Sequence, residues 1–178
     1  MDDSKPLELE QQGEYDAAAA AFATAGFQKV LSSHARLNSE TRLGIGMLLE
    51  AISCDVRIDN KRRAAFLYDV IEPLLTELAE TSETTVLRGV ATEWLGDAAL
   101  LLERPDTVDQ YRAARAVYEG VTWDDKAVVD DPDFMHSYWA MEGFAEHHGA
   151  ELPPPDRSTS FQKRIDAKLD LAGDVLST

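Results

Sequence analysis

The sequence holds few of the features that mark secreted or membrane proteins. Its 178 residues include one cysteine, Cys54, so an internal disulfide cannot form and a reducing compartment is the natural home. No apolar run approaches the roughly 20 residues that a membrane-spanning helix needs. The opening MDDSKPLELEQQ carries acids where a signal peptide carries positive charge. We therefore expect a cytoplasmic protein without a membrane partner.

Positive charge is also scarce. The chain has 17 basic residues against 33 acidic ones, which gives a formal net charge of −16, and only 6 of the basic residues are lysines. This field repels phosphate groups, so we expect no nucleic-acid partner. Abundant aspartate and alanine with little lysine resembles the proteins of salt-in halophilic archaea, in which molar salt shortens the Debye length to about 3 Å. The alternative is that the acidity serves solubility alone.

Catalytic motifs are missing too. The sequence has no phosphate-binding glycine loop, no Gly-x-Ser-x-Gly and no His-Glu-x-x-His, so we expect neither an enzyme nor a cofactor. Residue types that bind metals gather between Asp133 and His148, namely Asp133, His136, Glu142, Glu146, His147 and His148. They lack the paired Glu-x-x-His motifs of a di-iron bundle. A solvated helix end is the preferred interpretation, and a metal-dependent activity is the least favoured alternative.

Helical periodicity runs through most of the chain. Apolar residues recur every three or four positions over 60–80, 83–103 and 161–176, and no stretch alternates for long enough to make a strand. Pro73 predicts a kink or break within the first of these helices. Ser82 and the Arg104-Pro105-Asp106 segment are expected to mark helix boundaries.

These patterns predict an all-α fold of about seven helices. We expect one domain over residues 1–178, with a flexible N-terminus at 1–12 and a proline-rich linker at 150–157 before the last helix.

A repeated pairing of small and aromatic residues indicates how these helices pack. In the segment GEYDAAAAAFATAG, Ala18 stands four residues before Phe22, and the same spacing recurs at Ala64 with Tyr68 and Ala114 with Tyr118. Leu-Gly pairs precede the second and third of these, at Leu43-Gly44 and Leu95-Gly96. The pattern resembles the tetratricopeptide repeat, although its units are 46 and 50 residues apart instead of about 34.

The resemblance implies a right-handed superhelical stack of antiparallel helix pairs. A small residue on one helix would admit an aromatic side chain from its neighbour, and each pair would bury its open face on the next. The alanine run from Ala17 to Ala21 is then expected to be a packed helix and not a flexible tether.

The resemblance also implies an intracellular protein-interaction or scaffold module. In this family the first helix of each pair lines a concave groove that binds a peptide or partner helix, and here that face would present Arg42, Leu48, Trp94 and Phe144. Because three of these four are apolar, an apolar peptide or helix is the expected partner.

Several alternatives remain open. The same residues could pack against the chain's own last helix through Phe161, Ile165 and Leu169, or the helices could enclose a small molecule, as in a sensor domain. Homo-oligomerisation is also left open by the sequence.

We predict that folding depends on salt. Lowering KCl from molar concentration to about 0.1 M lengthens the Debye length to roughly 10 Å, so the acidic surface repels itself more strongly. The helical signal in circular dichroism and the unfolding temperature should both fall. Equal stability at the two salt concentrations would contradict the halophilic interpretation.

Overall fold

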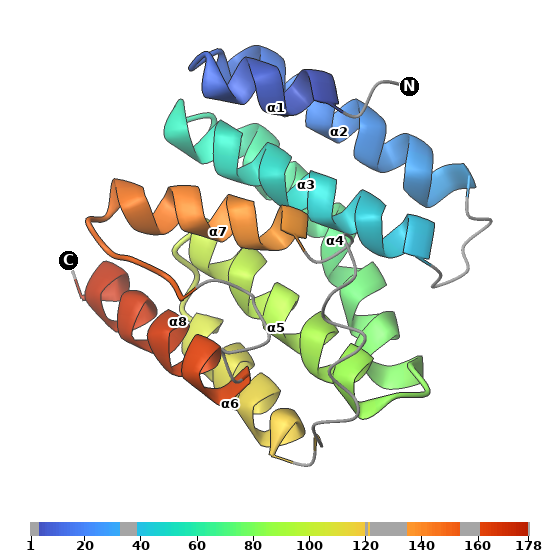
Figure 1. Ribbon diagram of the computed structural model, residues 1–178, viewed down its shortest axis with the longest axis vertical. Coiled ribbons are helices and arrows are strands. Elements are labelled where there is room, and N and C mark those ends of the chain that lie inside the picture. Colours follow the sequence, from blue (N-terminus) through green and yellow to red (C-terminus); the bar gives the residue numbers. More distant parts are fainter. Residues whose placement is uncertain (1–3, 33–38, 120, 122–134, 154–160, 178) are drawn as a thin grey trace.

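The computed structural model describes residues 4–32, 39–119, 121, 135–153 and 161–177, and this part of the chain contains eight α-helices and no strand (Figure 1). They are α1 (Ser4–Gln11), α2 (Tyr15–Ser32), α3 (Ser39–Arg57), α4 (Lys61–Thr81), α5 (Thr85–Leu101), α6 (Thr107–Tyr118), α7 (Met135–His147) and α8 (Phe161–Leu176). The predicted all-α class is confirmed. There is one helix more than expected because residues 4–11, predicted to be flexible, form α1. None of the described helices is long and apolar enough to cross a membrane.

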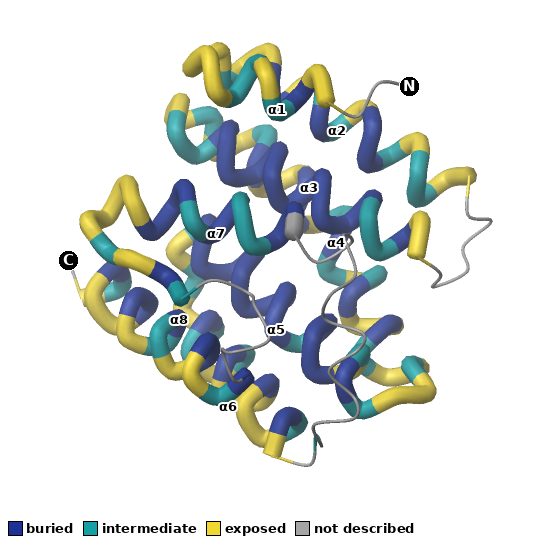
Figure 2. The backbone as a smooth tube through the Cα atoms, viewed as in Figure 1, coloured by how far each residue is buried: buried dark blue, intermediate teal, exposed yellow. Residues whose placement is uncertain are grey.

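Neighbouring helices of the chain pack side by side. Contacts join α1 to α2, α2 to α3, and so on to α6, which packs against α8. Helix α7 departs from this order and lies against α3 and α5 (Figure 1). As a result α3 and α5 are enclosed on most sides. Every residue of α3 from Gly44 to Asp55 is buried, and α5 is almost as fully covered (Figure 2).

The alanine run forms the first half of α2, as predicted. Ala18 and Ala19 are buried while Ala17 and Ala20 are exposed, which is the pattern of a helix with one packed face. The three small-aromatic pairs of the sequence are all buried, namely Ala18 with Phe22, Ala64 with Tyr68, and Ala114 with Tyr118.

Two glycines of α5 let this helix approach α6 closely. A Cβ atom built on Gly96 would lie 2.5 Å from Cδ1 of Tyr111, and one built on Gly89 would collide with the ring of Tyr118. The contacts run in opposite directions along the two sequences, so α5 and α6 are antiparallel. The glycines therefore provide the space into which the two tyrosine rings of α6 fit.

Side-chain hydrogen bonds mark the helix ends between α4 and α5. Ser82 and Pro73 differ from what the sequence predicted. Thr84 caps α5 by accepting a hydrogen bond from the Leu87 N–H at 3.2 Å, whereas Ser82 ends α4 by donating its own N–H to the Leu78 carbonyl at 3.1 Å. A kink or break was expected at Pro73, and α4 shows no break there: the helix continues through this exposed proline, which has no N–H to donate to the Asp69 carbonyl.

We predict opposite effects for two glycine-to-alanine changes. Gly96→Ala should lower the free energy of unfolding by about 1–3 kcal/mol because the new methyl group overpacks against Tyr111. Gly173→Ala, on the exposed side of α8 with nothing within 4 Å of the added Cβ, should raise it by up to about 1 kcal/mol through helix propensity. Urea denaturation measures both, and a stabilising Gly96→Ala would contradict the close α5–α6 approach.

Candidate functional site

Four charged side chains are buried where α8 meets α5. Glu93 and Asp97 lie one turn apart on α5, and Arg164 and Lys168 have the same spacing on α8. A separation of four residues places both members of each pair on one face of its helix. The four are 2%, 0%, 9% and 3% exposed in that order, so almost no water reaches them.

The two cations and the two carboxylates form a continuous network. The Nε and Nη2 atoms of Arg164 donate to the two oxygens of Glu93 at 2.6 and 2.5 Å, a bidentate arrangement. The Nζ atom of Lys168 donates to both oxygens of Asp97, at 2.7 and 2.8 Å, and to Oε1 of Glu93 at 2.7 Å. Lys168 therefore joins the two acids into one unit.

Helix α6 completes the network with two tyrosines. The Tyr118 hydroxyl donates to Oε2 of Glu93 at 2.7 Å, and the Tyr111 hydroxyl donates to Oδ1 of Asp97 at 3.0 Å. The first residue of α8, Phe161, stacks on the Tyr118 ring at a centroid distance of 4.4 Å and an interplanar angle of 11°. The α5–α6 face thus offers α8 two carboxylates and an aromatic surface in a fixed arrangement.

The surroundings shift the pKa values of the two acids in opposite directions. Burial alone would raise the pKa of Glu93, but the charges of Arg164 and Lys168 outweigh it and hold this pKa well below its usual range. Burial raises the pKa of Asp97 to about 6, with Glu93 adding to the rise and Lys168 opposing it. Glu93 is therefore the permanent anion of the network, and Asp97 is its titratable member.

The four residues predicted to line a groove lie mostly inside the molecule. Leu48, Trp94 and Phe144 are at most 3% exposed, and Arg42 is half-buried. Leu48 packs against α2, where a Cβ atom built on Gly26 would lie 2.9 Å from its Cγ. A partner could touch these three apolar side chains only after a covering helix had moved.

The faces of α3 and α5 that were expected to line an open groove are covered. Helix α7, which was expected to line the same groove through Phe144, packs against α3 and α5 instead. Helix α8 packs against α6 and reaches α5 through Arg164 and Lys168, with Phe161 and Ile165 buried and Leu169 half-buried. The alternative in which the last helix packs on this face therefore describes the α5 side of the structure. The face also differs in character from the apolar groove expected, since Glu93 and Asp97 lie at its centre.

On the α3 side the cover is α7. Nδ1 of His136 lies 3.2 Å from Oε1 of Glu50, and the Ser53 hydroxyl donates to the Ala140 carbonyl at 3.0 Å. Residue numbers rise together on the two helices, so α3 and α7 are parallel. Burial raises the pKa of Glu50 well above its ordinary value.

The described residues do not assemble the metal ligands considered from the sequence. His136 pairs with Glu50, and no group of three or more His, Cys, Asp or Glu side chains in this part of the chain is placed to hold a metal ion. Asp133, the first residue of that candidate set, lies outside the described residues.

Arg164 and Lys168 were not among the residues predicted from the sequence to form a site with the acids of α5. The sequence does contain a matching pattern: the two acids are four residues apart, and so are the two basic residues. Glu93 and Asp97 fall on a face otherwise rich in apolar residues, and buried acids require cations. The spacing alone could not tell which of the chain's 17 basic residues would supply them.

We predict that Asp97 makes stability depend on pH in a definite direction. Its pKa of about 6 in the folded chain exceeds the value of about 3.9 expected in the unfolded chain, so the folded chain binds this proton more tightly. The resulting stabilisation is complete below about pH 4 and is lost as the pH rises through about 6.

When the pH falls from 7.5 to 4, the free energy of unfolding of the wild type should therefore rise relative to that of the Asp97→Asn variant by roughly 1–3 kcal/mol. Urea denaturation of both proteins at constant salt measures this difference, and the ¹³C shift of the Asp97 carboxyl reports its titration independently. If the difference in unfolding free energy between the two proteins is the same at both pH values, Lys168 keeps Asp97 ionised throughout and the prediction is contradicted.

No model of a known protein family matches the chain, and comparison with curated proteins and with solved structures also gives no match.

Proposed function

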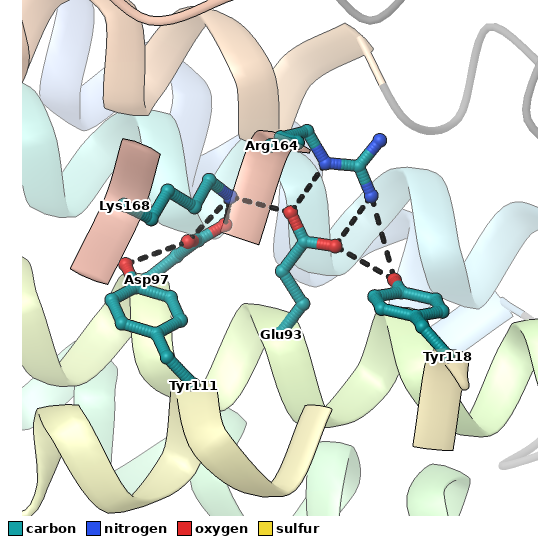
Figure 3. A network of polar contacts seen from close by, with 6 residues as sticks. All are labelled: Glu93, Asp97, Tyr111, Tyr118, Arg164 and Lys168. Atoms are coloured by element: carbon teal, nitrogen blue, oxygen red, sulfur yellow. Dashed lines mark hydrogen bonds and ion pairs between the residues drawn. The ribbon is translucent and has the colours of Figure 1, made fainter. Parts of the chain in front are cut away.

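We propose that the chain is a tetratricopeptide-like interaction module that binds a basic amphipathic helix on the α5–α6 face, which α8 occupies in this structure. The observation that carries the proposal is the docking of one helix through two cations onto two buried carboxylates (Figure 3). Glu93 and Asp97 define the charge that a ligand helix must present, and the two tyrosines of α6 fix their positions.

The repeat-like packing supports this proposal. Helices α2 to α6 pack in chain order, and small residues admit aromatic rings between α5 and α6. In a tetratricopeptide-like stack the inner helices, here α3 and α5, offer the ligand surface. Both are covered by helices from the C-terminal part of the chain.

The buried acids make the face selective. An unpaired carboxylate in this interface would cost about 3–5 kcal/mol, because it has left water without gaining a counter-ion. A helix without cations at the right spacing is therefore rejected, whatever its apolar surface. The expected ligand carries Arg and Lys four residues apart, with an aromatic residue three positions before the Arg, as Phe161, Arg164 and Lys168 do here.

A partner helix has to compete with α8. A segment joined to its site by a short linker acts at an effective concentration in the millimolar range. A partner at micromolar concentration must therefore bind the vacated face about a thousandfold more tightly than an unlinked α8 peptide would. Only then does it displace α8 from half of the molecules. Helix α8 thus prevents weak ligands from binding, and only tightly binding ligands displace it.

Exchange of α8 tests the proposal. A protease site inserted between residues 153 and 161 would be cleaved after folding of the full chain, and the nicked protein mixed with a fluorescent peptide of residues 158–178. We expect the peptide to replace α8 and bind saturably, whereas the same peptide with Arg164→Gln and Lys168→Gln should bind at least tenfold more weakly.

A second peptide separates recognition from simple repacking. It keeps Phe161, Arg164, Ile165 and Lys168 and replaces the exposed positions of α8, and it should compete as well as the native sequence. If α8 does not exchange while the nicked protein stays folded, or if the neutral peptide binds as tightly as the native one, α8 is a permanent part of the fold and the proposal fails.

A further inference from the structure

The outward face of α4 carries an apolar stripe that the described part of the chain leaves open. Phe66 is 59% exposed and is one of three large apolar side chains exposed among the described residues. Val70, half-buried, and Pro73, exposed, follow it by four and seven positions, so all three share one face of the helix. The buried Ile71 and Leu75 lie on the opposite side, where α4 packs on α3 and α5.

Charges of opposite sign stand at the two ends of this stripe. Arg62 lies one turn before Phe66. Glu77 and Glu80 follow Pro73 by one and two turns. The three charged residues are exposed, and their side chains form no ion pair or hydrogen bond within the described part of the chain. The stripe is therefore basic at its start and acidic at its end.

This order of charges is unfavourable within a single chain. The helix dipole favours acids in the first turn of a helix and bases in the last turn, and α4 has neither. Arg63 is offset because it pairs with the buried Asp55 and with Asp16, whereas Arg62 beside it has no such acid. An antiparallel helix, which would bring its acidic end to the basic end of α4, would relieve the conflict.

A second copy of α4 has the required charges in the required places. Setting Phe66 of one copy opposite Pro73 of the other fixes the register of two antiparallel helices. The same register sets Arg62 opposite Glu77, with Glu80 one turn on, because both pairs are centred on one point near the middle of α4. A two-fold axis at that point makes the two ends of the contact identical.

Helix geometry keeps the charged ends within reach of each other. Arg62 and Glu77 stand about 11 Å along the helix from the point on which the pairs are centred. At the crossing angle of about 20° that is common for helices packed side by side, the two axes diverge by only about 4 Å over that distance. The long side chains of Arg and Glu can bridge this divergence.

We propose that the exposed face of α4 is a dimer interface whose partner is a second copy of this chain. The apolar stripe supplies the attraction, and the ion pairs at its two ends set the orientation. One helix packed on its copy falls below the roughly 1,200 Å² of standard interfaces, so the dimer is weak and reversible. The α5–α6 face takes no part in this contact.

Sedimentation equilibrium of the full chain tests the proposal. In about 0.5 M KCl the Debye length of about 4 Å screens the repulsion between two chains of net charge −16 but still allows contact ion pairs. We expect a monomer–dimer equilibrium between about 10 µM and 1 mM protein. Phe66→Gln should weaken it at least tenfold. The matched control, Leu31→Gln, removes an exposed apolar side chain from α2 and should dimerise as the wild type does.

Exchanged charges test the antiparallel register. Arg62→Glu leaves only acids at each end of the contact, and Glu77→Lys with Glu80→Lys leaves only bases, so each protein alone should dimerise at least fivefold more weakly. Their equimolar mixture should recover the wild-type affinity, because each end of a mixed dimer again holds both signs of charge. General repulsion between acidic chains would instead make the variant with two added lysines dimerise more tightly.

Circular dichroism at the same salt verifies that these variants, all changed at exposed positions, keep the helical signal of the wild type. A wild type that stays monomeric up to about 1 mM, or a Leu31→Gln variant as weak as Phe66→Gln, overturns the proposal. Failure of the mixture to recover the dimer overturns it as well, because the antiparallel register is then wrong. Assemblies larger than a dimer would show a contact that does not close on itself, which also contradicts it.

Discussion

Removing two carboxylates from water is the constraint on which the C-terminal half of the structure depends. The effective penalty is several kcal/mol for each ion, so Glu93 and Asp97 can be buried on α5 only where cations meet them. Arg164 and Lys168 repeat the same four-residue spacing on α8, and a shift of α8 by one residue would break both contacts at once. Charge therefore sets the register of α8, whereas apolar contact area alone would tolerate several registers.

The carboxylates reach these positions because α5 and α6 approach closely. Gly89 and Gly96 admit the rings of Tyr118 and Tyr111, which brings both hydroxyl groups within hydrogen-bond distance of the acids. A small residue in one helix thus determines where a polar group of the next helix stands. In this way the packing of small residues against aromatic rings also positions the two carboxylates of the candidate site.

Periodicity revealed the helices and much of the core, because both depend on residues that are close in sequence. The burial of Ala18, Ala64 and Ala114 follows from small-aromatic spacing within single helices. The positions of α7 and α8 depend instead on contacts between distant parts of the chain, such as Glu50 with His136 and Glu93 with Arg164. A sequence with 33 acidic and 17 basic residues allows very many such pairs, and spacing does not select among them. For this reason the expected open groove is a covered face in the structure.

The charges of this chain fall into two groups that respond differently to salt. Exposed carboxylates dominate the net charge of −16, and their mutual repulsion is screened as salt rises. The ion pairs of Glu93 and Asp97 lie out of water and are screened much less. High salt therefore relieves the repulsion that opposes a compact chain while leaving the attachment of α8 almost unchanged. A ligand helix that relied on exposed ion pairs would lose affinity under those conditions, whereas one that buried its cations against α5 would keep it. Burying the charges thus allows the ion pairs that hold α8 to persist at salt concentrations that suppress electrostatic contacts at the surface.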